Sequence, residues 1–507
     1  MRSSLLPAST MIVVGFLVVA CASAMSPSPN TTPASGPASS EASATPSPTP
    51  GSTGATTASP SRPPLPASAS LPVRGSAHEI GVLTAPGPSG TLYVSIPRPD
   101  GSVLALLDPS GRPRPGWPIA VRDSTSCGLL LPVDDGSVRV ICHGTDLPQP
   151  DDDPSQVRAF AFDAGGRPFA GWPVELPFGW PAGFVGYMVG DELTHFAEQR
   201  LTVDPDSGAV SYEAWVTSVA VNGTIRSGVR VPRVETACCA ERWGVGPDGV
   251  AYGTVHNYGD SPEAPKSSEL LAVGFAGARA GFPIAIGGLA SEPSFDAAGR
   301  IHVTVNDGTD RTARALVFDT SGRAAVGGSD DLGVSATDEC VGIEGSCEVP
   351  AAPLVGADGT RFVVGAYFNN TAVAGVNPSG EDMAGWPYRS DDGHQGKGIC
   401  AAGDICEGYS LATPAIGPDH VIYLIHAAPT NSVGGSLVAV GPDGRVRPGW
   451  PVELRRPGAE FWSVVVGSDG TAYALAIEPE TGDSSSASIL AIAPDSTVLY
   501  ATTIIDP

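Results

Sequence analysis

A three-residue motif recurs along this chain at a spacing too long for a single hairpin or helix. Gly-Trp-Pro, or Gly-Phe-Pro in one copy, is centred on Trp117, Trp172, Phe282, Trp386 and Trp450. The first two copies lie one period of about 55 residues apart, and the next two gaps each span about two such periods. The chain is therefore an array of similar units, two of which have lost the motif.

Remnants of the two missing copies stand where the period places them. Residues 218–223 precede Val231-Pro232, and residues 315–322 fill the other gap. One more unit follows Trp450 and contains residues 489–495. This gives eight units of about 54 residues between His78 and Pro507.

Each unit contains two hairpins of short apolar strands. An Asp-Gly pair separates the strands of the hairpins at residues 464–473 and 436–452. Glycine accepts a positive φ and aspartate bonds its own backbone, so these pairs favour turns. Several strands are apolar at every position, as strands covered on both faces are. We predict an all-β chain folded as an eight-bladed β-propeller of four-stranded antiparallel blades.

The tryptophans of the motif are expected near the outer strands, where they pack between blades rather than stack on a ligand.

The sequence predicts that the chain is divided into three parts. The expected segments are a signal peptide with a lipobox at 1–20, a lipidated cysteine and disordered Pro/Ser/Thr/Ala linker at 21–70, and the propeller at 71–507, with blades near 78–121, 126–177, 178–234, 235–287, 288–336, 337–391, 392–455 and 456–507.

The N-terminus has the pattern of an export signal. Arg2 precedes an apolar run at residues 11–20, too short to span a bilayer as a permanent helix. Residues 17–21 resemble the lipobox of bacterial lipoproteins, which implies that Cys21 is lipidated. An ordinary signal peptide cut near residues 22–24 is the alternative. Both readings predict an exported protein, and the first predicts an anchor on the extracytoplasmic face of a bacterial membrane.

Composition restricts the partners. The formal net charge of −25 argues against binding nucleic acid or an anionic lipid surface. Contact with a membrane is therefore expected only through the lipid anchor. Residues 22–70 are almost all Ser, Thr, Pro, Ala or Gly, which cannot bury enough apolar area to fold.

The apolar strand followed by Asp-Pro-Ser-Gly or Gly-Pro-Asp-Gly and then by Pro-Gly-Trp-Pro resembles the pyrroloquinoline-quinone-like (PQQ-like) propeller repeat. It is also similar to the FG-GAP type of repeat in surface propellers. The resemblance covers residues 78–507 and implies the fold rather than an activity. FG-GAP blades usually carry a calcium loop, but residues 108–111 or 441–444 supply one carboxylate at most, so no calcium site is expected.

Two classes of function remain. The favoured one is a non-catalytic envelope protein that binds a protein or glycan and needs no cofactor. The alternative is an enzyme, either a carbohydrate-active propeller or a quinoprotein dehydrogenase using PQQ with calcium. Resemblance to quinoproteins draws attention to Cys238-Cys239, because a disulfide between adjacent cysteines lies against the cofactor in some of them. No catalytic, cofactor-binding or metal-binding residue is assigned, and the eight histidines lack metal-ligand spacing.

Apart from Cys21, eight cysteines remain, an even number in an exported chain, which predicts disulfides. Cys127 and Cys142 flank a hairpin and suit a cross-strand bridge. Cys340 with Cys347, and Cys400 with Cys406, would close long loops. Elimination leaves a possible vicinal disulfide between Cys238 and Cys239, although eight cysteines allow 105 connectivities.

Overall fold

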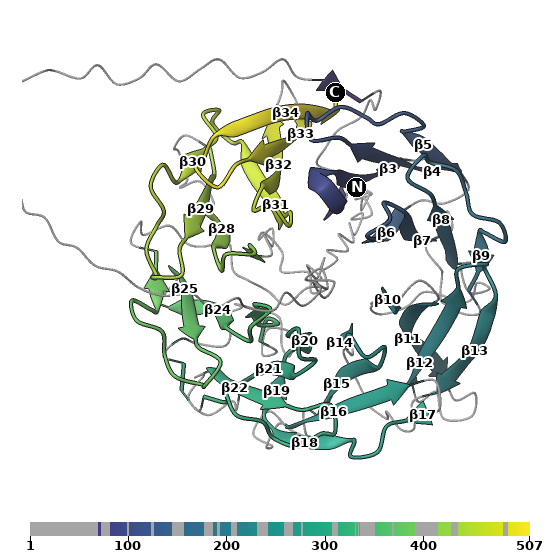
Figure 1. Ribbon diagram of the computed structural model, residues 1–507, viewed down its shortest axis with the longest axis vertical. Coiled ribbons are helices and arrows are strands. Elements are labelled where there is room, and N and C mark those ends of the chain that lie inside the picture. The colour runs from purple at the N-terminus through teal and green to yellow at the C-terminus, as the bar shows by residue number, and fades with distance from the viewer. Residues whose placement is uncertain are drawn as a thin grey trace, which may run out of the picture.

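The computed structural model is an eight-bladed β-propeller in which each blade is an antiparallel sheet, as predicted (Figure 1). The blades follow one another around the ring in sequence order. The structure describes residues 69–71, 82–98, 101–122, 126–143, 157–176, 186–189, 193–203, 210–230, 242–257, 267–274, 277–306, 313–329, 331–332, 334, 350–367, 370–390, 414–426, 434–479 and 485–506.

The first four blades run from the inner strand to the outer strand in chain order. They are β2–β5 (Leu83–Pro86, Leu92–Arg98, Gly101–Leu107, Ile119–Arg122), β6–β9 (Ser126–Pro132, Val138–His143, Val157–Phe162, Val174–Glu175), β10–β13 (Gly186–Val189, Leu193–Val203, Val210–Ala220, Ile225–Arg230), and β14–β18 (Arg242–Val245, Ala251–Asn257, Ser267–Gly274, Gly277–Ala278, Ile284–Gly287), where β17 and β18 both pair with β16.

The last four blades repeat this order with two irregularities. In blade 5 the inner strand is split into β19 and β20, which both pair with β21. In blade 8 a fifth strand, β1 (Ala69–Ser70), is added outside β34. The strands are β19–β22 (Leu289–Ala290, Ser294–Phe295, Ile301–Asn306, Ala313–Phe318), β23–β26 (Leu354–Val355, Arg361–Tyr367, Asn370–Val376, Tyr388–Arg389), β27–β30 (Ala415–Ile416, Ile422–His426, Ser436–Val440, Val452–Glu453) and β31–β34 (Glu460–Val466, Ala472–Pro479, Ser485–Ile492, Val498–Ile505).

The up-and-down order gives the ring two different ends. The turn after the first strand of a blade and the turn after the third lie at one end, which we call the turn face. Residues 133–136 and 163–166 of blade 2 are examples, each closed by a backbone hydrogen bond between its first and last residue. Connections between the second and third strands, and between blades, lie at the opposite end, the loop face.

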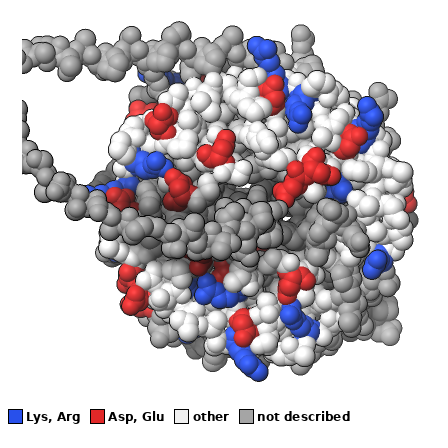
Figure 2. All heavy atoms as spheres, in the orientation of Figure 1, with Lys and Arg blue, Asp and Glu red and all other residues white. Residues whose placement is uncertain are grey.

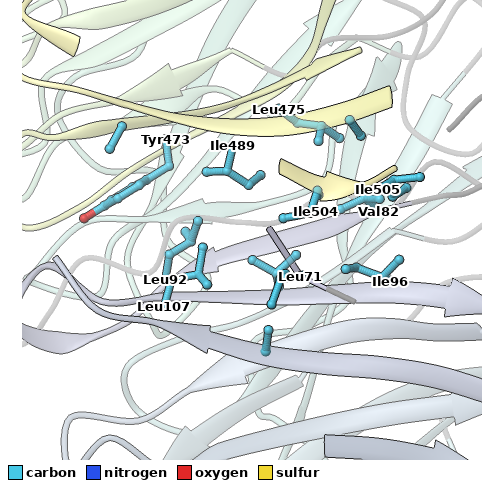
Figure 3. Packing of buried hydrophobic residues seen from close by; sticks show 14 of the residues in the cluster. Leu71, Val82, Leu92, Ile96, Leu107, Tyr473, Leu475, Ile489, Ile504 and Ile505 are labelled. Carbon is cyan, nitrogen blue, oxygen red and sulfur yellow. The ribbon is translucent and has the colours of Figure 1, made fainter. Parts of the chain in front are cut away.

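Ring closure joins the segment just before the first blade to the last blade. β1 pairs in parallel with β34 and lies inside the range expected as linker. The amide of Leu71 donates to the carbonyl of Thr503 at 3.0 Å, and the Leu71 side chain is buried. Figure 3 shows Leu71 among Leu92, Ile489 and other apolar residues of blades 1 and 8.

The tryptophans of the repeated motif join neighbouring blades, which confirms their predicted packing role. Trp117, Trp172 and Trp450 are buried. An indole N–H donates to the second residue of the next blade's outer turn in four cases, at 3.2 Å from Trp117 to Ala164, 2.8 Å from Trp172 to Val221, 3.0 Å from Trp386 to Pro442 and 3.3 Å from Trp450 to Pro494. All five motif prolines follow cis peptide bonds.

Glycine is required in the motif because two backbones meet there. Gly171 has φ 86°, and a Cβ on it would overlap the carbonyl oxygen of Asn222 in the next blade. Gly223 meets Gly171 in the same way from the other side. Glycine alone provides both the positive φ and the close approach.

A second contact between blades comes from tyrosines on second strands. Tyr423 donates to the carbonyl of Gly470 at 3.2 Å and Tyr473 to that of Gly90 at 3.0 Å, each in the next blade. Burial, with the nearby Asp419 carboxylate, raises the pKa of Tyr423 to about 12. These hydroxyls therefore remain protonated donors at ordinary pH.

Acidic and basic side chains are interspersed over the face of the ring in Figure 2. In the described part of the chain, no helix has the length and apolar character needed to cross a membrane.

Candidate functional site

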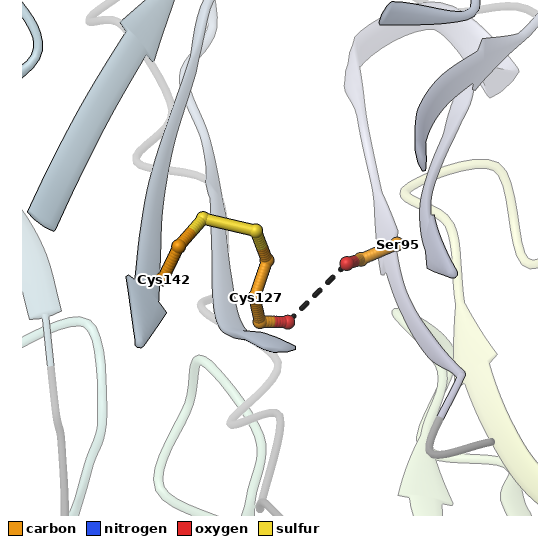
Figure 4. Close-up of a disulfide and its surroundings, with 3 residues drawn as sticks. All are labelled: Ser95, Cys127 and Cys142. Carbon is orange, nitrogen blue, oxygen red and sulfur yellow. Dashed lines mark hydrogen bonds between the residues drawn. A yellow bond between two sulfur atoms is a disulfide. The ribbon is translucent and has the colours of Figure 1, made fainter. Parts of the chain in front are cut away.

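Of the cysteines singled out from the sequence, the structure describes Cys127 and Cys142. They are opposite each other in the β6–β7 register, and their sulfur atoms are 2.10 Å apart in a disulfide (Figure 4). Both are buried between blades 1 and 2, where Ser95 donates to the carbonyl of Cys127 at 3.2 Å. The other candidates lie outside the described residues, namely Cys21, Cys238, Cys239, Cys340, Cys347, Cys400 and Cys406.

A cluster of buried ionisable groups lies between blades 5 and 6. At its centre is Asp296, at the turn between β20 and β21. Its Oδ1 accepts from the amides of Ala298 at 3.0 Å and Arg300 at 2.9 Å. Its Oδ2 accepts from Arg300 Nε at 2.5 Å and His302 Nε2 at 3.1 Å. Four donors therefore surround one carboxylate.

These donors keep Asp296 ionised. Burial by itself would raise its pKa, but the hydrogen bonds from His302 and Arg300 outweigh burial and lower the pKa to about 2. A carboxylate with this pKa and with both oxygens engaged is a poor general base near neutral pH. Its geometry suits holding other side chains in place.

The cluster continues into blade 6 through Arg361 on β24. Arg361 is fully buried, and its guanidinium donates to the carbonyl of Gly327 in blade 5. Burial lowers the pKa of Arg361 to about 10, and the neighbouring Arg300 adds to this while Asp296 opposes it. Arg300 also donates to the carbonyl of Asp358 in blade 6 at 3.3 Å. Charged groups thus connect the two blades.

At the turn face the polar contacts extend to blade 7. His420 Nε2 is 3.2 Å from Asp358 Oδ1, and Arg447 NH1 is 3.0 Å from Asp419 Oδ2. His420 has φ 60° and occupies the position that glycine holds in the equivalent turns. These side chains are partly exposed, so the Arg447–Asp419 ion pair contributes about 0–1 kcal/mol.

Two further histidines face serines across neighbouring strands. His195 Nδ1 lies 2.8 Å from Ser218 Oγ, and His256 Nδ1 lies 3.0 Å from Ser268 Oγ. All four side chains are buried. The Ser268 hydroxyl also donates to Gly288 O and accepts from the amide of Ala290, so it joins β16 to the next blade. The hydroxyl is occupied as a link between strands rather than presented as a nucleophile.

Aspartates of the outer turns stabilise the turns themselves. Asp108 Oδ1 accepts from the amides of Ser110 at 2.8 Å and Arg112 at 3.1 Å, and Asp163 and Asp319 repeat this arrangement. Within the described residues, no group of three or more His, Cys, Asp or Glu side chains could hold a metal ion.

Sequence reasoning did not identify the cluster between blades 5 and 6. A usable signal existed, because the third residue after the first turn's glycine is tyrosine in blades 1, 4 and 8 but His302 in blade 5. The partner Arg361 is distant in sequence, and only the stacking of blades brings it close.

Comparisons with known proteins give similarity to solved structures only. No protein-family model matches the sequence, and no curated protein sequence does either. A prolyl endopeptidase is 12% identical with a TM-score of 0.42, over 82% of this chain and 54% of its own. A eukaryotic initiation factor is 12% identical with a TM-score of 0.43, over 84% and 87%.

A quinoprotein alcohol dehydrogenase-like protein from Bacteroides thetaiotaomicron is 9% identical with a TM-score of 0.33, over 73% of this chain and 89% of its own. The chain spans about half the length of the prolyl endopeptidase, 54%.

Proposed function

We propose that this chain is an exported, lipid-anchored protein of a bacterial envelope whose propeller binds a protein or glycan partner without catalysing a reaction. Residues 11–21 support export and anchoring through Cys21, and the Pro/Ser/Thr/Ala-rich stretch that follows supports a tether. The only membrane contact in this proposal is the lipid, and nucleic acid is not a partner.

The observation that carries the binding role is the difference between the two ends of the ring. At the turn face, tight turns of neighbouring blades are joined by hydrogen bonds such as Trp172 to Val221 and Tyr473 to Gly90. The long connections, such as residues 144–156 and 390–414, start and finish at the loop face. Variable connections on a rigid scaffold are the usual place for recognition, so we place the partner at the loop face.

Photo-crosslinking from defined positions in the intact cell envelope tests this placement. Arg455 and Pro457 are exposed at the loop face, between β30 and β31, whereas Val326, 76% exposed, and Asp495 lie near the turn face. We expect a discrete crosslinked product from a photoreactive residue at 455 or 457 and none from 326 or 495. Crosslinking only from 326 or 495 would contradict the placement.

Anchoring and the enzymatic alternative are tested separately. Metabolic labelling with a clickable fatty acid should mark the wild type and not Cys21→Ala, and equal labelling of both would exclude the anchor at Cys21. Titration of the purified protein with PQQ and calcium should give no stoichiometric uptake. Uptake with dye-linked alcohol oxidation would instead establish the quinoprotein alternative.

A further inference from the structure

We propose that the junction between blades 5 and 6 is an acid-responsive joint of the ring, in which a second proton on His302 loosens the contact between these two blades. Such a joint would regulate the scaffold whatever partner the propeller binds.

The hydrogen bonds determine where the first proton of His302 lies. Asp296 is ionised and can only accept, so His302 Nε2 must carry the hydrogen of the 3.1 Å contact with Asp296 Oδ2. The other ring nitrogen, Nδ1, then carries a lone pair. Nδ1 is buried and has no hydrogen-bond partner among the described residues. A second proton would create a buried donor without an acceptor, which is costly.

The surrounding charges oppose the same proton. Asp296 and Arg300 of blade 5 and Arg361 of blade 6 are the charged groups around His302. Its register partners on β20 and β22 are the uncharged Ser294 and Val317. A protonated imidazole would become the third cation around one buried carboxylate. Burial and Arg361 lower the pKa of His302, with Asp296 opposing them, so the ring is neutral near pH 7.

The blade 5–6 junction also lacks the contact that the Gly-Trp-Pro motif makes between other blades. Blade 5 carries Gly327-Gly328-Ser329 at the position of Gly-Trp-Pro, and Gly327 lies against the turn of blade 6 near Pro378. No indole crosses this junction between described residues. Its apolar cluster consists mainly of alanine and valine side chains, such as Ala315 and Val363.

Polar contacts therefore hold this junction together. Arg361 donates to Gly327 O, Arg300 donates to Asp358 O, and the amide of Ala297 donates to Ala357 O at 3.2 Å. A Cβ on Gly359 of blade 6 would lie 3.1 Å from Asp296 Oδ2, so the carboxylate itself lies at the blade boundary. A new positive charge on His302 would repel both arginines that make these contacts.

Hydrogen–deuterium exchange of the full chain, compared between about pH 7.5 and about pH 5 after correction for intrinsic exchange, tests the joint. Protection of peptides covering β21, β22 and β24 should fall on acidification by up to about tenfold per pH unit, the limit for one proton. Peptides of blades 1 and 8 should change less. An equal loss in all eight blades, or no loss in blades 5 and 6, would overturn the proposal.

His302→Gln is the matched variant, because its side-chain amide can still donate to Asp296 but cannot take up a proton. The acid response of blades 5 and 6 should disappear in it and persist in His256→Gln. A full response in His302→Gln would contradict the proposal. A direct measurement requires no variant: C2-hydrogen exchange of the His302 imidazole should give a pKa below the ordinary value of about 6.5. A pKa at or above that value would also overturn it.

Discussion

The indole N–H of Trp172 donates a hydrogen bond to the carbonyl oxygen of Val221 in the neighbouring blade, 2.8 Å away. The same contact is made by Trp117, Trp386 and Trp450 with the corresponding residue of the next turn. The motif that repeats in the sequence therefore joins neighbouring blades. Phe282 fills the position in blade 4 and has no N–H to donate.

Replacement of Trp172 should separate the hydrogen bond from the packing. Trp172→Phe keeps an aromatic ring but loses the donor, and we expect it to lower the free energy of unfolding by about 1–3 kcal/mol. Trp172→Ala should cost about 3–5 kcal/mol. Urea unfolding measures both. A Trp172→Phe variant as stable as the wild type would show that the indole N–H contributes nothing.

A Cβ at Gly171 should be more damaging than one at Gly277. Both glycines have positive φ, 86° and 108°, so alanine brings backbone strain at either position. At Gly171 the new methyl group also overlaps Asn222 O, whereas nothing lies within 4 Å at Gly277. Gly171→Ala should therefore cost about 1–3 kcal/mol more than Gly277→Ala in denaturant unfolding. Similar losses would contradict the close approach of the two backbones.

The disulfide between Cys127 and Cys142 should stabilise blade 2. It closes a loop with a sequence separation of 15, for which the loss of chain entropy in the unfolded state predicts about 3 kcal/mol. The double variant Cys127→Ala/Cys142→Ala should unfold at a lower temperature and no longer respond to a reductant through this bond. Non-reducing peptide mapping checks the pairing, and a different partner for either cysteine would exclude it.

Leu71 should contribute more to the stability of the propeller than its position beside the expected linker suggests. It is 3% exposed in the cluster between blades 8 and 1, so Leu71→Ala should cost about 2–5 kcal/mol. Leu499→Ala is the control, because Leu499 is 45% exposed on β34 and should change stability by less than about 0.5 kcal/mol. Thermal unfolding compares them, and a neutral Leu71→Ala would mean that the ring closes without this residue.

Acid should destabilise the protein through His195. Burial lowers its pKa to about 4, against about 6.5 in the unfolded chain. The unfolded state therefore binds the proton more tightly, so this contribution to stability is complete above about pH 6.5 and falls as the pH drops towards 4. Denaturant unfolding at several pH values should show a shallower slope for His195→Gln than for the wild type. An unchanged slope would refute this.

Much of the fold was predictable because its signals are local. Turns at Asp469-Gly470 and Asp443-Gly444 depend on backbone conformation within four residues, and blade number follows from counting these units. The packing role of Trp117 and Trp172 was also predictable, since a large aromatic ring beside an outer strand needs a neighbour to cover it. The charged cluster could not be predicted, because Asp296 and Arg361 belong to different blades that are distant in sequence.

The sequence by itself therefore determined an all-β chain of eight repeating units with its turns and apolar strands, since periodicity and turn chemistry act over short distances. Only the tertiary structure decided which atoms meet across blades. It set the indole of Trp172 against Val221, brought Arg361 to Asp296 and His302, and placed Leu71 between the first and last blades. These contacts depend on how twisted sheets stack around a closed ring, which no local pattern encodes.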